Sequence, residues 1–259
     1  MYHGTSASAG IGIGKVAIVE DVQLVIKKEG VADPKAEAER FKQALEQSLQ
    51  ETAALAADLA TRVGEKEAEI LNGHLMLLSD PMLVGEIENT IANEGVNSEY
   101  AIEQVCNMYA DMFASMGDEL MQQRATDMRD IKTRMQKVLM GVESVDIASL
   151  PAGTVIAAKD LTPSMTAGIN PQNVVGIVTE LGGRTSHSAI LARALEIPAV
   201  VAVSDFLAQV KNGDEIVLDG SEGTVYVNPE AEVKADYESR REAFLKEKKE
   251  LEQYIGKPT

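Results

Sequence analysis

The chain has 259 residues, of which 45% are hydrophobic and 4% are aromatic. This composition allows a sizeable core and excludes global disorder. The formal net charge of −17 argues against nucleic acid and anionic membranes as partners, and leaves basic proteins and metal ions open. The single cysteine, Cys106, excludes an internal disulfide and indicates a reducing compartment. Neither a run of 18 apolar residues nor a signal peptide is found, so we expect a cytoplasmic protein without membrane insertion.

The first part of the chain predicts strands and then a long helix. Residues 11–26, IGIGKVAIVEDVQLVI, indicate two short strands joined by an Asp-containing turn. From Pro34 onward, apolar residues recur every three or four positions, which is typical of one helical face. Asp33 before Pro34 is a good N-cap followed by proline at the first helical position. Isolated strands are not stable, so we expect the N-terminal strands to join a sheet formed later in the chain.

Residues 34–141 predict a helical bundle with short connections. Further helical patterns cover residues 65–78, the stretch that Pro81 opens, the stretch that Ser98 starts, and the stretch that ends at Gly141. Glycines separate these patterns, as expected at helix C-termini.

The C-terminal part predicts an α/β domain followed by a charged helix. Val- and Ile-rich runs indicate five strands, and the stretch SAILARAL, residues 188–195, indicates a helix between the second and third of them. The fold class is therefore an α/β domain with an inserted all-α helical bundle and a C-terminal linker helix. The expected domains are 1–30 plus 145–228 for the α/β domain, 34–141 for the inserted bundle, and 229–259 for the linker helix.

The stretch GGRTSH, residues 182–187, lies between a predicted strand and a predicted helix. The glycines Gly182 and Gly183 permit positive φ and close approach of a ligand to the backbone. The hydroxyl residues Thr185 and Ser186 are good N-caps, which places His187 in the first turn of the helix, where anions are stabilised.

Arg184 adds a cation with bidentate geometry for phosphate oxygens. The helix N-terminus disfavours imidazolium, and a neutral imidazole nitrogen is what a nucleophile needs. The stretch therefore fits a histidine that attacks and carries a phosphoryl group. The plainer interpretation is a histidine that only begins a helix.

The other candidate residues carry weaker signals. His74 lies in an apolar helical run and is interpreted as a core or interface residue, because no second metal ligand stands four residues away. Cys106 lies on an apolar helical face and is interpreted as inert core.

Charge is unevenly distributed along the bundle. Between Lys66 and Arg124 there is no Lys or Arg, but there are eleven carboxylates. One interpretation is a solvated acidic surface. The other is a docking surface for a basic protein, because opposite charge speeds association.

The stretch GGRTSHSAILARALEIPAVV resembles the phosphohistidine motif of enzyme I, the phosphoenolpyruvate–protein phosphotransferase of the bacterial sugar phosphotransferase system. The stretches SAGIGIGKV, GHLMLLSDPML, RATDMRDIKTR, AKDLTPSMTA and VKNGDEIVLDGSEGTVYVNP agree with the same family in the same order. The resemblance therefore covers the whole chain and is specific.

The resemblance implies a phosphohistidine (swivelling β/β/α) domain in which His187 is phosphorylated at Nε2 from phosphoenolpyruvate and passes the phosphoryl group to the phosphocarrier protein HPr. Thr166 is expected beside the imidazole as a hydroxyl partner, and Arg184 as a further catalytic residue. The loop residues Gly182, Gly183, Thr185 and Ser186 are expected to support the phosphate. The helical domain 34–141 is expected to bind HPr through His74, Met76, Leu77, Met82, Leu83, Glu67, Glu86 and Arg124.

In this family a (β/α)8 barrel follows, which binds phosphoenolpyruvate and Mg²⁺ and drives dimerisation. The chain therefore resembles the amino-terminal half of enzyme I. We expect it to bind no metal itself, to exchange phosphate with HPr only, and to be monomeric, whereas the full-length protein is expected to form a homodimer.

Two other functions stay open at this point. The first is the swivelling phosphohistidine domain of a dikinase, such as pyruvate phosphate dikinase or phosphoenolpyruvate synthase, which carries a similar motif but takes its phosphoryl group from ATP. The second is a non-catalytic module whose acidic bundle binds a basic partner.

Overall fold

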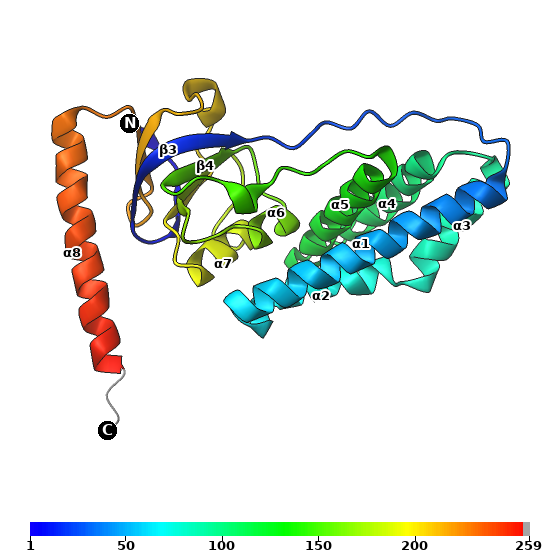
Figure 1. Ribbon diagram of the computed structural model, residues 1–259, viewed down its shortest axis with the longest axis horizontal. Coiled ribbons are helices and arrows are strands. Elements are labelled where there is room, and N and C mark those ends of the chain that lie inside the picture. Colours follow the sequence, from blue (N-terminus) through cyan, green and yellow to red (C-terminus); the bar gives the residue numbers. More distant parts are fainter. Residues whose placement is uncertain (256–259) are drawn as a thin grey trace. The chain divides into compact units, whose positions relative to one another are not determined.

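The computed structural model describes residues 1–255, which form two compact units (Figure 1). The α/β unit consists of Met1–Glu20, Asp146–Leu161 and the chain from Gly168 onward. The helical unit consists of Asp21–Val145 and Thr162–Ala167. The helical unit is therefore an insertion, as the sequence analysis expects. The unit boundary falls at Glu20 rather than at residue 30, and the short segment 162–167 groups with the helices.

The α/β unit is built on one mixed sheet with the strand order β1-β8-β7-β3-β4-β5-β6-β2 in the described residues. The four central strands β3, β4, β5 and β6 are parallel to one another, and the remaining pairings are antiparallel. The strands are β1 (Tyr2–His3), β2 (Thr5–Ser8), β3 (Ile11–Val19), β4 (Thr154–Ala158), β5 (Val174–Thr179), β6 (Ala199–Val201), β7 (Glu215–Asp219) and β8 (Thr224–Val227).

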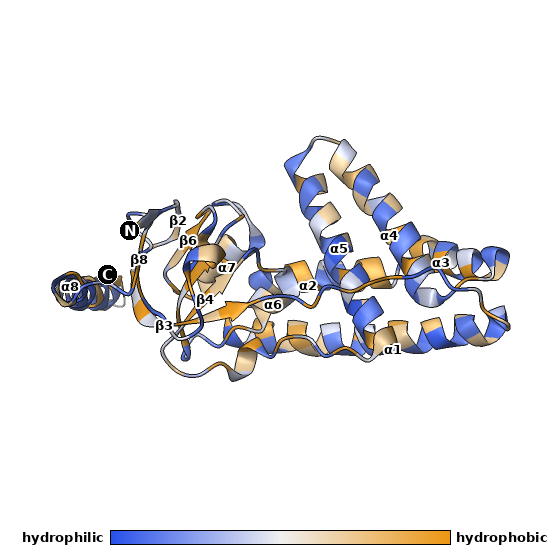
Figure 2. Cartoon of the chain, turned by 90° about the horizontal axis from the view of Figure 1, so that it is seen from above, coloured by the Kyte–Doolittle hydropathy of each residue, from blue (hydrophilic) through white to orange (hydrophobic). Residues whose placement is uncertain are grey.

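The central strands read as near-continuous apolar runs because both of their faces are covered. Every residue of β4 is buried, and Val155, Val178 and Val200 pack with Phe206 in one core cluster. Figure 2 shows most of these strands in the colour of hydrophobic residues. The N-terminal strands complete this sheet, because β3 pairs with β4 on one side and with β7 on the other.

The prediction of two strands over residues 11–26 was wrong. One strand, β3, covers Ile11–Val19, and the chain leaves the α/β unit directly afterwards, at Glu20. Residues 21–29 form no strand, because the end of this segment pairs with Asn97 instead: Glu29 N–H donates to Asn97 Oδ1 at 3.0 Å, and Glu29 O accepts from Asn97 N at 3.0 Å. The alternating apolar pattern there is that of an extended segment lying along the helices.

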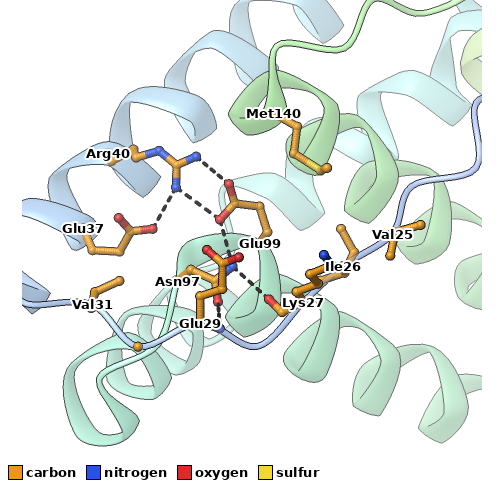
Figure 3. A pocket seen from close by; sticks show the side chains of 11 residues that line it. Val25, Ile26, Lys27, Glu29, Val31, Glu37, Arg40, Asn97, Glu99 and Met140 are labelled. Atoms are coloured by element: carbon orange, nitrogen blue, oxygen red, sulfur yellow. Dashed lines mark hydrogen bonds and ion pairs between the residues drawn. The ribbon is translucent and has the colours of Figure 1, made fainter.

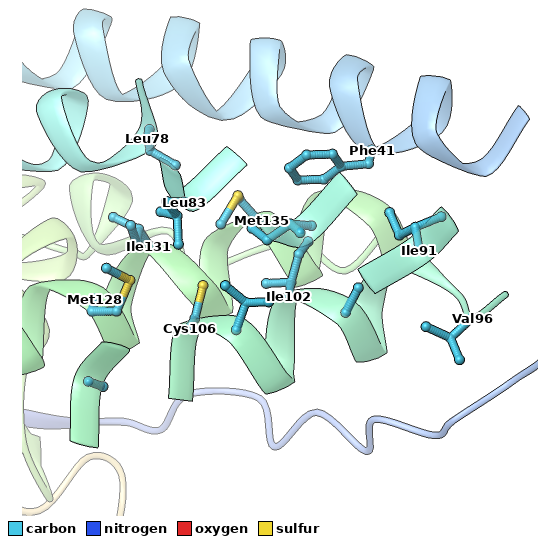
Figure 4. Packing of buried hydrophobic residues seen from close by; sticks show 14 of the residues in the cluster. Phe41, Leu78, Leu83, Ile91, Val96, Ile102, Cys106, Met128, Ile131 and Met135 are labelled. Carbon is cyan, nitrogen blue, oxygen red and sulfur yellow. The ribbon is translucent and has the colours of Figure 1, made fainter. Parts of the chain in front are cut away.

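The helical unit contains the five long helices that the sequence pattern indicates. They are α1 (Pro34–Arg62), α2 (Glu65–Leu78), α3 (Pro81–Glu94), α4 (Ser98–Ser115) and α5 (Glu119–Met140). A sixth helix, α6 (Pro163–Ala167), is not evident from the sequence. Their common core contains Phe41, Leu83, Ile102, Met128 and Ile131 (Figure 4).

The helix ends follow the local sequence signals. Asp33 Oδ1 accepts hydrogen bonds from Lys35 N and Ala36 N at 3.0 and 3.2 Å, with proline at the first helical position. Gly95 and Gly141 end α3 and α5 with φ of 61° and 65°, a left-handed conformation that glycine adopts without steric cost. Each expected helix therefore starts and stops near its predicted bounds.

The α/β unit carries two further helices, α7 (His187–Ala194) and α8 (Ala231–Ile255). Helix α8 is mostly hydrophilic in Figure 2, and Tyr237 is its only buried residue in the described part of the chain. Tyr237 packs on Tyr226 of β8 with ring centroids 5.3 Å apart, and Lys234 pairs with Glu215 at 2.6 Å. These contacts attach the start of α8 to the sheet, and Leu245 and Leu251 further along are more than half exposed. Two 3₁₀ turns, Ile147–Ser149 and Phe206–Gln209, complete the unit.

The fold class is the expected one: an α/β unit, an inserted all-α bundle and a C-terminal helix. Among residues 1–255, none of the helices is long and apolar enough to span a membrane.

Candidate functional site

The loop between β5 and α7 contains the GGRTSH stretch and has a defined geometry. Gly182 has φ of +99°, a conformation that side-chain-bearing residues rarely adopt. Ser186 is the N-cap of α7: its Oγ accepts a hydrogen bond from Ala189 N at 3.3 Å and donates to Gly183 O at 2.8 Å. The turn and the cap together fix where the helix begins, and its first residue is His187.

His187 is therefore in the first turn of a helix, as the sequence analysis expects, and it is half-buried. The unpaired N–H groups of a helix N-terminus give this end a partial positive charge that stabilises a phosphoryl group. A neutral imidazole presents one unprotonated ring nitrogen, which is the nucleophile that phosphoryl transfer needs.

Arg184 is exposed on this loop, where its guanidinium is available to a bound phosphate. The residue that holds the loop is not evident from the sequence. Arg193, in the last turn of α7, donates through Nη2 to Arg184 O at 3.0 Å and through Nη1 to Ala7 O of β2 at 2.8 Å. The only sequence signal for this role was the presence of a basic residue, Arg193, in the short helix that follows the motif.

Two expectations for the loop residues need correction. Gly183 does not have positive φ, because Gly182 alone makes the turn. Thr185 does not cap the helix, because Ser186 occupies the N-cap position and Thr185 is exposed in the preceding turn. Both residues remain in the loop that precedes His187.

Thr166 lies on α6, and so it belongs to the helical unit, whereas His187 belongs to the α/β unit. The Thr166 side chain is buried, and its Oγ1 donates to Thr162 O at 2.9 Å. An intrahelical hydrogen bond of this kind leaves the hydroxyl lone pairs as acceptors.

The residues expected to bind a partner protein fall into two groups. Met76 and Met82 are 73% and 69% exposed, Arg124 is exposed, and Glu67, Leu77 and Glu86 are half-buried. We call Glu67, Met76, Leu77, Met82 and Glu86 the α2–α3 surface.

His74 and Leu83 do not belong to this surface. His74 is 0% exposed, with its Nε2 3.0 Å from Asp127 Oδ1 of α5. Leu83 is 2% exposed and belongs to the bundle core. The expectation that these two residues contact a partner is therefore corrected, because both side chains lie in the interior of the bundle.

The acidic span is less uniform than its sequence suggests. Five of its eleven carboxylates face a cation within 4 Å, namely Glu88, Glu94, Glu99, Glu103 and Asp111. Two more, Asp80 and Asp118, cap α3 and α5. The remaining carboxylates are Glu67, Glu69, Glu86 and Glu119, and three of these lie on α2 and α3. The negative charge available to a partner is therefore concentrated there.

A separate pocket of about 430 Å³ lies between residues 25–31 and the starts of α1 and α4. Figure 3 shows that its polar side chains point toward one another. Arg40 donates to Glu99 at 2.5 and 3.1 Å and to Glu37 at 2.8 Å, and Asn97 Nδ2 donates to Lys27 O at 3.1 Å. Since the charged side chains pair with one another, we interpret this network as structural.

The pKa shifts in the network agree with this interpretation. The hydrogen bond and charge of Glu99 raise the pKa of Arg40. Burial by itself raises the pKa of Glu99, but the hydrogen bonds and charge of Arg40 more than offset it, so that the pKa of Glu99 is lowered. Both groups are therefore charged at neutral pH.

No other cluster in the described residues suggests catalysis. Within residues 1–255, no group of three or more His, Cys, Asp or Glu side chains is placed to hold a metal ion. Burial raises the pKa of the Cys106 thiol to about 12, and a protonated thiol is a poor nucleophile. The loop that precedes His187 is the candidate site.

Comparison with known proteins gives this loop its context. Residues 3–124 match the family model described as PEP-utilising enzyme, N-terminal, and residues 150–223 match the model described as PEP-utilising enzyme, mobile domain. The second match contains GGRTSH. The NMR solution structure of the enzyme I protein nEIt is 40% identical, with a TM-score of 0.81, covering 94% of this chain and 99% of that one.

The chain belongs to the phosphoenolpyruvate–protein phosphotransferase (enzyme I) family.

Curated relatives that carry the family's name support this assignment over nearly the whole chain. The phosphoenolpyruvate–protein phosphotransferases of Bacillus subtilis and Geobacillus stearothermophilus are 39% and 41% identical over 256 and 257 residues. Each alignment covers 99% of this chain but 45% and 44% of the relative. The chain thus spans less than half the length of these enzyme I relatives and corresponds to their amino-terminal domain.

A second solved structure, the N-terminal domain of Enzyme 1 - Nitrogen, is 26% identical with a TM-score of 0.61, covering 92% of this chain and 98% of that one. The enzyme I assignment takes precedence over the dikinase alternative, because the relatives are named phosphotransferases and the match includes the inserted helices.

Proposed function

We propose that His187 accepts a phosphoryl group at Nε2 and passes it to the phosphocarrier protein HPr. The observation that carries this proposal is the position of His187, which is the first residue of α7, directly after the Ser186 cap and the Gly182 turn, within the region matching the mobile domain of PEP-utilising enzymes. The family assignment supports a phosphotransferase.

The chemistry balances without any further reactant. The lone pair of neutral Nε2 attacks phosphorus, a P–N bond forms, and the bond between phosphorus and the donor atom breaks, with its electron pair going to the donor. In the onward step the acceptor group of HPr attacks the same phosphorus, and the P–N bond breaks with its electron pair returning to Nε2. A phosphohistidine produced in this way is a phosphoramidate, which is labile in acid and stable in alkali.

The loop supplies the stabilisation that this transfer needs. The phosphoryl oxygens face the N-terminus of α7, where each interaction with the helix dipole contributes about 0.3–1 kcal/mol at an exposed site. Arg184 contributes a cation able to bind two oxygens at once. The Thr166 hydroxyl is the proposed partner of the imidazole, with its proton held by Thr162 O.

HPr docks on the α2–α3 surface in this proposal. Met76 and Met82 supply exposed apolar anchors, while Glu67 and Glu86 supply charge that attracts a basic partner. Anchors of this kind dominate binding energy when a rim of charged groups surrounds them, and the charges chiefly raise the association rate.

The proposal assigns phosphoenolpyruvate and Mg²⁺ to the part of the relatives that lies outside the alignment. The 259 residues are therefore proposed to exchange phosphate with HPr and to be monomeric, with dimerisation and phosphoenolpyruvate binding supplied by a further domain.

Incubation with phosphorylated HPr tests the proposal. The intact mass of the chain should rise by one phosphate, and His187→Ala should abolish the increase, while His3→Ala, which changes an exposed histidine on β1, should retain it. A mass increase in the His187→Ala variant would reject the assignment.

A further inference from the structure

Helix α6 lies between β4 and β5 in the sequence but groups with the helical unit. It has five residues, Pro163–Ala167, and a helix this short is not stable by itself. Its position must therefore be set by contacts at its two ends.

Asp130 of α5 fixes the N-terminal end. This carboxylate is 4% exposed. It accepts a hydrogen bond from Ser164 N at 3.0 Å through Oδ2 and another from Ser164 Oγ at 2.8 Å through Oδ1. Hydrogen bonds to an ionised acceptor are roughly twice as strong as neutral ones, so the buried carboxylate holds the first turn of α6 against α5.

Arg62, the last residue of α1, fixes the C-terminal end. Its Nη2 donates to Ala167 O at 2.6 Å, and its Nε donates to Asp58 Oδ2 at 2.8 Å. A guanidinium bound to the last carbonyl of a helix also complements the negative end of the helix dipole.

Thr166 lies between these two anchors. Its N–H and its Oγ1 both donate to Thr162 O, at 3.0 and 2.9 Å. The direction of the hydroxyl is thereby set by the α6 backbone, and the α6 backbone is set by the contacts to Asp130 and Arg62.

We propose that Asp130 and Arg62 are positioning residues that attach the Thr166-bearing helix to the helical unit. The kinetic part of this inference rests on the role proposed above for Thr166. Thr166 then stays with the unit that carries the α2–α3 surface. Loss of either anchor should slow phosphoryl transfer at saturating phospho-HPr and leave KM for phospho-HPr unchanged.

Amide hydrogen exchange tests the anchoring directly and without HPr. Ser164→Ala and Arg62→Gln should increase exchange of residues 162–167 by about tenfold or more, because each removes a hydrogen bond involving a charged group. Asp130→Asn is a stronger perturbation. If the Asp130→Asn variant does not fold, Ser164→Ala tests the same contact. Asp58→Asn alters a different contact of Arg62, that of its Nε, and should leave exchange unchanged, as should Ser149→Ala. Unchanged exchange at 162–167 in both Ser164→Ala and Arg62→Gln would overturn the proposal.

A double-mutant cycle with Thr166→Val tests the link to transfer. If Ser164 and Asp130 act through Thr166, then Ser164→Ala should lower kcat about tenfold in the wild-type background and have no further effect in the Thr166→Val background. Equal effects in both backgrounds would overturn a positioning role. If Thr166→Val by itself leaves kcat unchanged, the proposed role of Thr166 fails, and exchange still decides whether the helix is anchored.

Discussion

Replacing Met76 and Met82 by alanine should weaken HPr binding without affecting the fold. These side chains are 73% and 69% exposed, so their packing within the bundle is slight and their removal should change the free energy of unfolding by no more than about 0.5 kcal/mol. Any larger consequence must come from what the exposed thioether groups contact when a partner is bound.

The size of the binding effect follows from the exposed fractions. Complete burial of a methionine side chain is worth about 1.5–3 kcal/mol. About seven-tenths of each side chain is still exposed, which leaves about 1–2 kcal/mol per residue to be gained on docking. Each substitution should therefore raise Kd about 5–30-fold. The double variant should lose close to the sum of the two free energies if the side chains do not touch.

Isothermal titration of HPr into each variant measures this effect, with thermal unfolding as the check on the fold. Met140→Ala makes the same chemical change at the end of α5, where the side chain is 40% exposed, and should leave Kd unchanged. A double variant of Met76 and Met82 that unfolds normally and binds HPr with the wild-type Kd would refute docking on the α2–α3 surface.

Three further predictions concern charge and substrate. Association with HPr should slow steeply between 0.1 and 1 M salt, where the screening length falls from about 10 to about 3 Å; stopped-flow rates that ignore ionic strength would leave only the apolar contact. Arg40→Met should destabilise the bundle by about 1–2 kcal/mol at pH 7. This loss is smaller than that of a buried ion pair, because the Arg40 side chain is 41% exposed to solvent. Since the pKa of Glu99 is lowered in the fold, its pairing contributes stability above the ordinary glutamate pKa of about 4.3 and loses it as the pH falls through the lowered value, so the difference between Arg40→Met and wild type in urea unfolding should shrink in acid. Phosphoenolpyruvate with Mg²⁺ should leave His187 unlabelled in this chain, and efficient labelling would show that the described residues contain a phosphoenolpyruvate site.

The long helices were predictable because periodicity and capping agree locally. Asp33, Gly95 and Gly141 mark helix ends by their own conformational preferences, and such signals do not depend on the rest of the fold. His187 at the start of α7 was predictable for the same reason, since the cap, the turn and the helix lie within one short stretch.

The features that the sequence did not predict depend on distant partners. Residues 21–29 have the alternation of a strand, but a strand needs a neighbour, and the chain leaves the sheet at that point. The bonds from Ser164 to Asp130 and from Arg62 to Ala167 join residues 34 and 105 positions apart. Burial of His74 and Leu83 likewise follows from how α2 and α3 pack on α5 and α4, which residue type alone does not reveal.

The most direct test of the central claim is to locate the phosphate itself. After labelling by phospho-HPr, digestion in alkaline conditions and fragment mass spectrometry should place the phosphate on His187, and ¹⁵N resonances of the labelled imidazole should place it on Nε2. The label should disappear in acid and survive in alkali. Phosphate found on Thr185, Ser186 or another histidine, or an acid-stable label, would contradict the account.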